Sequence, residues 1–439
     1  PEGQLAYDLV GWSWFGAGDF HVDFGFQVDP LTLVMMFVVT GVGFIIHVYA
    51  IGYMHEEYSF YRFFAYFNLF ASAMLLLVMG NNFLLMFIGW EGVGCCSYFL
   101  IGYYFEKQSA CDAGTKAFIV NRVGDFAFLL AVMYIFNIFG SIDFTTVMHA
   151  APEKLIYAGE AVTIITLLLF VGATGKSAQI PLYTWLPDAM EGPTPVSALI
   201  HAATMVTAGV YMVVRCNVLF NLAPMTMMVV AGIGAATAIM AATIGMTQFD
   251  IKRVLAYSTV SQLSYVILAA LILSPLSTMG AALHIAVHAF GKITLFMAAG
   301  AIYTAAHKIN ISQLDGIGKR MPWTMGGCVV GGLSLIGIPL TAVFISKWYL
   351  VLAALEKGWW PVIVVIIAGS LLAVLYVWKV VERAYLAKPP ENATKAEAPA
   401  SMLIPAWLLA IANLYFGSHT DLSVGGATRA AAELFGIAP

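Results

Sequence analysis

The feature that most constrains this chain is a succession of long apolar stretches with few charges among them. A membrane-spanning helix needs about 20 mostly apolar residues, and windows of that length occur about twelve times. They lie near 31–52, 62–79, 82–104, 116–139, 161–180, 195–218, 225–246, 254–273, 277–304, 324–346, 360–383 and 401–416. Charged residues make up 10% of the 439 residues, whereas a soluble domain carries about 25%. The sequence therefore predicts an all-α, polytopic membrane helix bundle and excludes a soluble enzyme.

Charge balance and cysteine spacing exclude further classes of function. The net charge is -4, without a basic tail or stripe, so no nucleic-acid partner is expected. The cysteines are Cys95, Cys96, Cys111, Cys216 and Cys328, and no two of them form a CxxC pair. We interpret them as small buried apolar residues and expect no metal, iron–sulfur cluster or other cofactor on this chain.

The spans divide the chain into four parts. Residues 1–61 are expected to form a Gly-rich extramembrane segment and the first span. Residues 62–220 and 221–383 each hold five spans, and residues 384–439 hold a Pro-containing linker, the last span and a tail. Because the chain begins with Pro1, we expect residues to be missing before it.

Glycine and proline interrupt two of the spans. The residues concerned are Gly172, Gly175, Pro181 and Pro187 in the fifth span, and Gly332, Gly337 and Pro339 in the tenth. Each interruption falls in the fourth helix of a five-helix unit, and matching interrupted helices are typical of inverted-repeat transporters. The freed backbone groups require protein or a water-filled cavity to satisfy them. Ordinary proline kinks are the alternative interpretation.

Ionisable residues inside the first unit are candidates for function, because a charge at mid-bilayer costs about 2.5–3.5 kcal/mol on insertion scales. Glu91 lies well inside the third span, as a carboxylate that responds to a cation or as a hydrogen-bonded structural plug. Lys176 lies at the interruption of the fifth span. We interpret Lys176 as a group that holds and releases a proton, with Glu91 as its electrostatic switch; the alternative is a lysine that reaches an interface.

Arg122 and Asp125 are three residues apart on the fourth span, so they share a helical face and are expected to pair. A buried ion pair that orients the bundle and a role in transport are equally compatible with this spacing.

The second unit carries three titratable residues on one helical face. His284, His288 and Lys292 follow one another at intervals of four residues in the ninth span. Two histidines at this spacing can bind a metal, but no acidic residue lies near them, and we favour a proton relay. His201, in the sixth span, is interpreted as part of the same relay rather than as a core histidine. Lys347 follows the second interruption and is the expected counterpart of Lys176, unless it reaches an interface.

Several segments resemble the antiporter-like membrane subunits of respiratory complex I, and in particular subunit L of NADH-quinone oxidoreductase, the ND-five type. The matching segments are DPLT at 29–32, WEGVG at 90–94, NRVGD at 121–125, GKSAQ at 175–179, TPVSALIHAATMV at 194–206, DIKRVLAYST at 250–259 and the run 284–292. Segments 291–296, 319–325 and 346–350 resemble the D subunit of multisubunit sodium/proton antiporters more closely.

The resemblance implies two inverted five-helix repeats, each with a half-channel at its interrupted helix. It implies that Glu91 and Lys176 form one half-channel pair, that the three histidines bridge along a central axis, and that Lys347 serves the exit side. It also implies other complex I membrane subunits as partners, including a neighbouring antiporter-like subunit, with FMN, iron–sulfur clusters and quinone bound by those partners.

The sequence therefore predicts a proton-translocating subunit of NADH-quinone oxidoreductase in an energy-transducing membrane, with the bacterial inner membrane favoured over the mitochondrial one. The first alternative is a subunit of a multisubunit sodium/proton antiporter. A purely structural membrane scaffold is the second, and the row of costly intramembrane charges argues against it.

Overall fold

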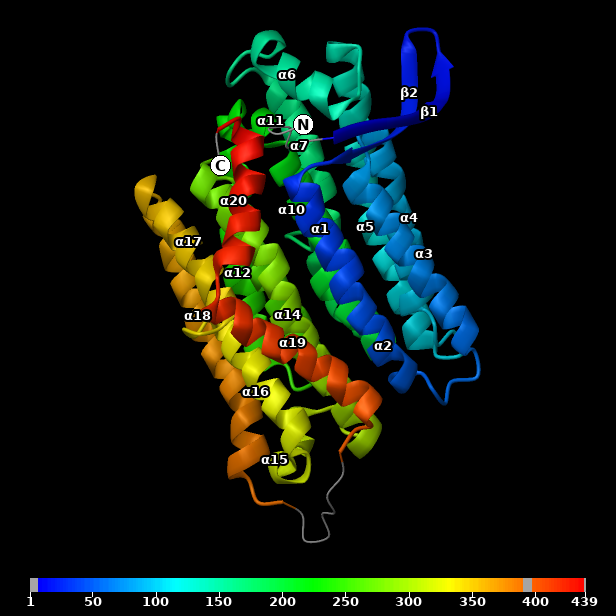
Figure 1. Cartoon of the computed structure of the whole chain (residues 1–439), viewed down its shortest axis with the longest axis vertical. Coiled ribbons are helices and arrows are strands. Elements are labelled where there is room, and N and C mark those ends of the chain that lie inside the picture. Colours follow the sequence, from blue (N-terminus) through cyan, green and yellow to red (C-terminus); the bar gives the residue numbers. More distant parts are fainter. Residues whose placement is uncertain (1–6, 390–396, 438–439) are drawn as a thin grey trace.

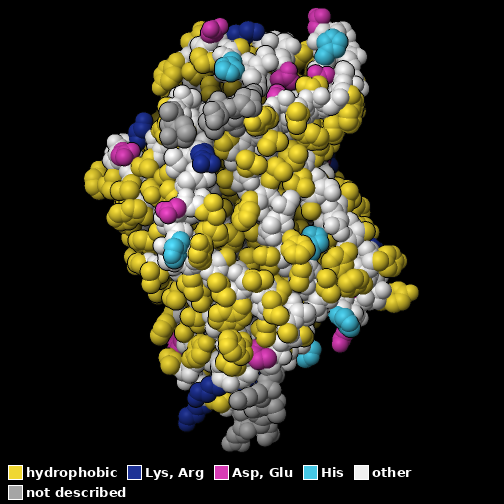
Figure 2. Space-filling view, in the orientation of Figure 1, with side chains coloured by type: hydrophobic (Ala, Val, Ile, Leu, Met, Phe, Trp, Pro, Cys, Tyr) yellow, Lys and Arg dark blue, Asp and Glu magenta, His cyan; other side chains and the backbone are white. Residues whose placement is uncertain are grey.

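The fold is a bundle of long helices with a small β-hairpin at one end (Figure 1). The computed structural model describes residues 7–389 and 397–437, so the middle of the expected linker lies outside the described residues. Figure 2 shows hydrophobic side chains over the middle of the visible face and charged ones mainly towards its two ends. This distribution is that of a protein whose middle faces lipid.

The elements of the first part are β1 (Tyr7–Ala17), β2 (Phe20–Val28), α1 (Pro30–Met36), η1 (Phe37–Val42), α2 (Gly43–Tyr53), α3 (Phe60–Met79), α4 (Phe83–Ile101), α5 (Gln108–Phe139), α6 (Phe144–Lys154), α7 (Glu160–Lys176), η2 (Leu182–Thr184), α8 (Trp185–Asp188), η3 (Ala189–Glu191), α9 (Thr194–Ala198), η4 (Leu199–Ala203), α10 (Met205–Arg215) and α11 (Asn217–Asn221). Those of the second part are α12 (Pro224–Thr247), α13 (Ile251–Ala270), α14 (Pro275–Ala306), η5 (Ile311–Gln313), α15 (Ile317–Arg320), α16 (Pro322–Ile336), α17 (Ala342–Glu356), α18 (Trp360–Val381), η6 (Glu382–Leu386), α19 (Ala400–Ser418) and α20 (Asp421–Phe435).

The prediction of an all-α membrane bundle is confirmed. Within the described ranges, nine helices are long and apolar enough to cross a membrane, and each coincides with an expected span. The other three expected spans differ in detail. The fifth is α7, which stops at Lys176; the eighth is α13, which is rich in serine; the tenth is divided into α16 and α17.

The hairpin is the part of the fold that the sequence analysis did not predict. Strands β1 and β2 pair antiparallel, with the Trp12 ring stacked 4.5 Å from that of Phe24. The hairpin attaches to the turn before α4, where the Asn82 side chain donates to the Asp23 carbonyl at 2.9 Å. It stands beside that end of the bundle in Figure 1, so it is an extramembrane element, as expected for this region.

Helix α19 crosses the bundle obliquely and joins its two parts (Figure 1). It packs against α2 from the first part and against α14, α16 and α17 from the second. At the centre of the bundle lies α14, which is buried almost along its whole length. The titratable residues of α14 are therefore enclosed by protein on every side.

Candidate functional site: a buried row of ionisable side chains

Lys176 occupies the last position of α7, where the helix is interrupted. Its side chain is fully buried, and its Nζ lies 3.5 Å from Oδ2 of Asp125 on α5. The other carboxylate oxygen of Asp125 accepts a hydrogen bond of 2.7 Å from Trp90 Nε1 on α4. Burial of an ammonium requires an opposite charge, and Asp125 supplies it. A Cβ added at Gly94 would lie 2.8 Å from Nζ, so this glycine leaves room for the amine.

Arg122 and Asp125 do not pair with each other, which corrects the expectation from their spacing. Each forms an ion pair with a different residue. Arg122 donates to Glu91 Oε1 at 2.7 Å, while Asp125 pairs with Lys176. The two residues do lie on one side of α5, as their spacing predicted, but the neighbouring helices α4 and α7 offer each of them an opposite charge. The direct partner of Lys176 is therefore Asp125. Glu91 belongs to the same cluster, but it pairs with the more exposed Arg122.

The chain directly after Lys176 is not helical, and it forms hydrogen bonds with polar groups of three other helices, α10, α12 and α13. Ser177 donates to the Val206 carbonyl at 2.8 Å, and the Ile180 amide donates to Thr237 Oγ1 at 3.2 Å. Ser264 of α13 donates to Gln179 Oε1 at 2.9 Å. An interrupted membrane helix is tolerated only with such partners. Because neighbouring helices supply them here, the interruption is a structured break in the helix and not an ordinary proline kink.

His201 lies in the π-helical segment η4, between α9 and α10. Its ring is buried 5.3 Å from the Phe296 ring of α14, and neither ring nitrogen has a hydrogen-bond partner among the described residues. Single π-helical turns inside longer helices occur frequently at functional sites. Buried ring nitrogens without a protein partner are typical positions for bound water.

The three titratable residues of α14 are all buried, as their shared face predicted. His284 Nδ1 is 2.9 Å from Ser346 Oγ on α17, and its ring centroid is 5.9 Å from that of His288. Lys292 donates to the Leu255 carbonyl at 3.1 Å and to the Ser258 hydroxyl, both on α13. The described residues contain no group of three or more His, Cys, Asp or Glu side chains that could hold a metal.

Lys347 projects from α17 back to the end of α16. Its Nζ donates to the carbonyls of Leu335 at 3.2 Å and Ile336 at 3.0 Å. It also donates to Ser370 Oγ on α18 at 2.9 Å. The last carbonyls of a helix form the negative end of its dipole, which favours a cation. Lys347 thus lies at the second interruption, as expected, but on the following helix, whereas Lys176 ends the interrupted helix itself.

Uncharged polar residues of α13 connect the two interruptions, and the sequence analysis missed them. Ser264 contacts the first interruption through Gln179, and Ser258 contacts Lys292. Gln262 donates at 3.2 Å to the Leu335 carbonyl, which also accepts from Lys347. These side chains carry no charge, so only the high serine content of this span could have indicated them.

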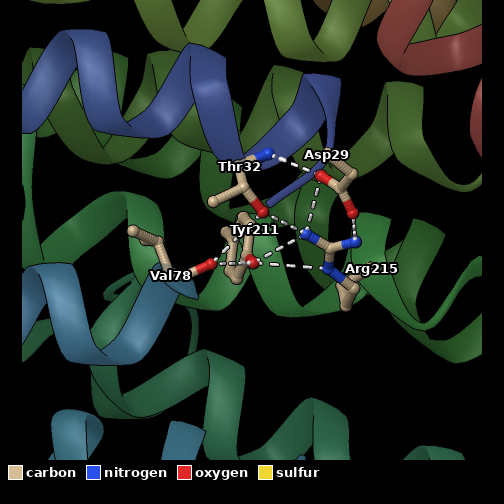
Figure 3. Close-up of polar contacts among 5 residues, drawn as sticks. All are labelled: Asp29, Thr32, Val78, Tyr211 and Arg215. Atoms are coloured by element: carbon tan, nitrogen blue, oxygen red, sulfur yellow. Dashed lines mark hydrogen bonds and ion pairs between the residues drawn. The ribbon is translucent and has the colours of Figure 1, made fainter. Parts of the chain in front are cut away.

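A second polar cluster lies away from this row, where α1 begins and α10 ends (Figure 3). Arg215 forms an ion pair with both carboxylate oxygens of Asp29 and donates to Thr32 Oγ1 at 2.8 Å. Tyr211 donates to the Val78 carbonyl at 2.6 Å and accepts from Arg215. Asp29 belongs to a segment that carried the family resemblance, but no feature of that segment indicates its partner.

The fold and this row of side chains define a class: polytopic α-helical membrane proteins with two interrupted helices around a buried charged axis. Residues 80–373 match the profile of the family described as NADH:quinone oxidoreductase/Mrp antiporter, TM, and residues 14–64 match that of the NADH-Ubiquinone oxidoreductase (complex I), chain 5 N-terminus. The chain belongs to the NADH:quinone oxidoreductase/Mrp antiporter family.

Similar proteins support the same assignment. NADH-quinone oxidoreductase subunit L of Pseudomonas aeruginosa is 45% identical over 93% of this chain and 65% of its own length. The subunits L of Escherichia coli and Mycobacterium tuberculosis are 44% and 42% identical over 87% and 95% of this chain, and 62% and 66% of their own lengths. The chain thus spans somewhat less than two thirds of these relatives. A solved Mrp complex from Dietzia contains a chain that is 26% identical, with a TM-score of 0.84, over 98% of this chain and 47% of that one.

The resemblance to subunit L is confirmed by these matches, and it includes the second part of the chain. An alignment over 95% of the residues cannot leave out α12–α18. The likeness of that part to sodium/proton antiporters is consistent with the fold shared with the Mrp complex.

Proposed function

We propose that this chain is a proton-translocating membrane subunit of an NADH-quinone oxidoreductase. The observation that carries the proposal is the buried row from Lys176 to Lys347, which passes through protein at the depth of the membrane. Charged groups are expensive there and are retained where ions or protons move. The similarity to three bacterial subunits L favours a redox-driven complex.

In this proposal, residues 62–220 and 221–383 are inverted repeats with one half-channel each. The first helices of the two units, α3 and α12, run in opposite directions through the bundle in Figure 1, which supports an inverted relation. Protons enter beside Lys176, where Asp125 and the Glu91–Arg122 pair set its charge. They pass His201 and the α14 residues, with water between the buried ring nitrogens, and leave past Lys347.

The position of the Glu91–Arg122 pair supports a neighbouring membrane subunit as partner. The Arg122 side chain is 49% exposed and that of Glu91 is 21% exposed, although both lie within spans that are long and apolar enough to cross a membrane. Exposed charges at this depth are unfavourable against lipid. We infer that another antiporter-like subunit covers α4 and α5 at the depth of Glu91 and Arg122, and that FMN, iron–sulfur clusters and quinone belong to other partners.

The distribution of basic residues supports an orientation in an energy-transducing membrane, and the bacterial relatives favour the bacterial inner membrane over the mitochondrial one. The helix ends and loops on the side of α2 and α15 carry Arg62, Lys107, Lys116, Lys252, Arg253, Lys308, Lys319, Arg320, Lys379, Arg383 and Lys388. At the opposite end, the described loops and helices carry Lys154, Arg215, Lys357 and Arg429, and Arg215 is paired with Asp29. By the positive-inside rule, the side of α2 and α15 is cytoplasmic.

Mild purification from the native membrane with partners attached tests this function. The proposal predicts that flavin and iron–sulfur absorbance co-purify with the chain. Co-purification of small hydrophobic subunits alone would contradict it and favour a sodium/proton antiporter subunit, the alternative that the fold of the Mrp complex supports. Transport that depends on external sodium would distinguish that alternative in reconstituted vesicles.

A further inference from the structure

A cavity of about 250 Å³ lies where α3 begins and α4 ends, away from the buried row. One arginine and several aromatic rings line it: Arg62, Tyr66, Tyr98, Phe99, Tyr103 and Phe105. Tyr98 and Phe105 are partly exposed, at 40% and 58%, so the cavity opens on the outer surface of the bundle. It is large enough for a small polar group such as a phosphate with its attached carbons.

Arg62 is an unusual arginine because it is half-buried without an acidic partner. Its guanidinium carbon lies 5.0 Å from the Tyr103 ring centroid and 4.9 Å from that of Phe105. Its one described hydrogen bond, to the Tyr103 carbonyl, is long at 3.5 Å, and its Nε is buried without a partner. Within the described ranges, no carboxylate forms an ion pair with it.

The chemistry of this site favours an oxyanion. A guanidinium offers five donors in a planar fork that matches the oxygens of a phosphate or carboxylate. Lys107, whose Nζ lies 4.9 Å from the Tyr104 ring centroid, adds positive charge at the same end. The nearby Glu57 accepts a hydrogen bond from the Tyr104 hydroxyl at 3.0 Å, and among the described ion pairs none joins it to Arg62.

The location of the cavity identifies the source of that oxyanion. Arg62 lies in the first turn of a spanning helix, at the level where phospholipid headgroups meet protein. Tyr58 and Tyr61, exposed by 99% and 79%, flank it as aromatic residues do at a membrane interface. We propose that this cavity binds the phosphate of a membrane phospholipid, with Arg62 as its ligand and the aromatic rings against the glycerol carbons. This binding is independent of proton translocation.

Cys111 provides the test, because it lines the same cavity. The complex that contains this chain is placed in nanodiscs of phosphatidylglycerol, of phosphatidylcholine or of a phosphate-free galactolipid. The rate of Cys111 alkylation by a maleimide is then followed by peptide mass spectrometry. We expect alkylation to be about tenfold slower in both phospholipids than in the galactolipid, which corresponds to about 1.4 kcal/mol of protection.

Two variants and one added ion complete the test. In R62Q the difference between lipids should disappear, whereas in R383Q, which removes an exposed arginine at the same end, it should persist. Inorganic phosphate added to galactolipid discs should not protect; if it does, the site binds free anions and the lipid assignment is wrong. Equal rates in all three lipids also overturn the proposal: fast rates mean no ligand, and slow rates mean that a partner protein covers the cavity. The unmodified chain alone distinguishes these outcomes, even if R62Q does not assemble.

Discussion

Asp125 is the residue on which the charge of Lys176 depends most directly, since it is the carboxylate within ion-pair distance. Removing one partner of a buried pair leaves an uncompensated charge at a cost of about 3–5 kcal/mol. We expect D125N to lower NADH-driven proton translocation at least about threefold, measured by dye quenching in inverted membrane vesicles. D188N, which disrupts an exposed pair with Lys116, is the matched control and should translocate normally. Full translocation by D125N would refute the role given to Asp125.

The Asp29–Arg215 pair should contribute to stability rather than to transport. Both side chains are buried, and among the described residues their partners do not belong to the buried row from Lys176 to Lys347. Either D29L or R215M alone should therefore destabilise the protein by about 3–5 kcal/mol, whereas the two substitutions combined should cost much less than the sum of the single effects. Thermal unfolding in detergent, arranged as a double-mutant cycle, measures this. Additive single effects would show that the two side chains do not interact.

The sequence indicated individual ionisable residues but not their partners. Lys176, His284 and Lys292 can be recognised from the sequence because an ionisable residue within an apolar span is costly and is therefore a candidate for function. Arg215 and Asp29 are 186 positions apart, and nothing in either local sequence records that distance. Gln262 is uncharged, so its position at the second interruption is evident only from the packing of α13.

At the scale of elements, the second interruption depends on a residue from a distant helix. Asn413 of α19 accepts from Ser334 of α16 at 3.0 Å and from the first amide of α17, that of Ala342, at 3.1 Å. N413A removes both bonds and should lower the free energy of unfolding by about 1–3 kcal/mol, the cost of unsatisfied buried groups. N68A, at an exposed asparagine of α3, should have little effect. Equal melting temperatures for the two variants would contradict this account.

Attachment of the hairpin should depend on pH. Burial, opposed by a hydrogen bond from Ser141, raises the pKa of Asp143, and Asp23 and Asp8 raise it further. A carboxyl whose pKa is higher in the folded than in the unfolded protein stabilises the fold at acidic pH, and this contribution is lost as pH rises through the folded value. The protection factors of the hairpin amides, which correct for the base-catalysed intrinsic exchange rate, should therefore fall between acidic and neutral pH, and less so in D143N. An unchanged pH dependence in D143N would exclude Asp143 as the cause.

The helices were predictable and the hairpin was not recognised, although it has a local signal. Apolar windows of about 20 residues identify spanning helices almost independently of context. In the hairpin, aromatic residues such as Trp12 and Trp14 alternate with polar or small ones, and Gly18 and Asp19 form the turn, with Gly18 at a φ of +61°. This alternation is a weaker signal than the twelve apolar windows. The Gly-rich composition of the segment favoured an irregular structure over a hairpin.

For the whole molecule, the structure accounts for how two distant interruptions can act together. Side chains of α13 contact both of them, and the central α14 carries three titratable residues between them. In the proposed function, the polar contacts of α13 at both interruptions and the titratable residues of α14 between them let a change of charge at Lys176 influence Lys347. The expected repeats remain our proposal, supported by the opposed directions of α3 and α12 (Figure 1).

The central claim is that protons move along this row, and Lys176 tests it most directly. The complex is reconstituted in vesicles, and protons translocated per NADH oxidised are measured for the unmodified chain, K176M and K116M, the last at an exposed lysine. We predict that K176M lowers the ratio while NADH still oxidises, and that K116M leaves it unchanged. A K176M complex that translocates protons at the full ratio would contradict the account.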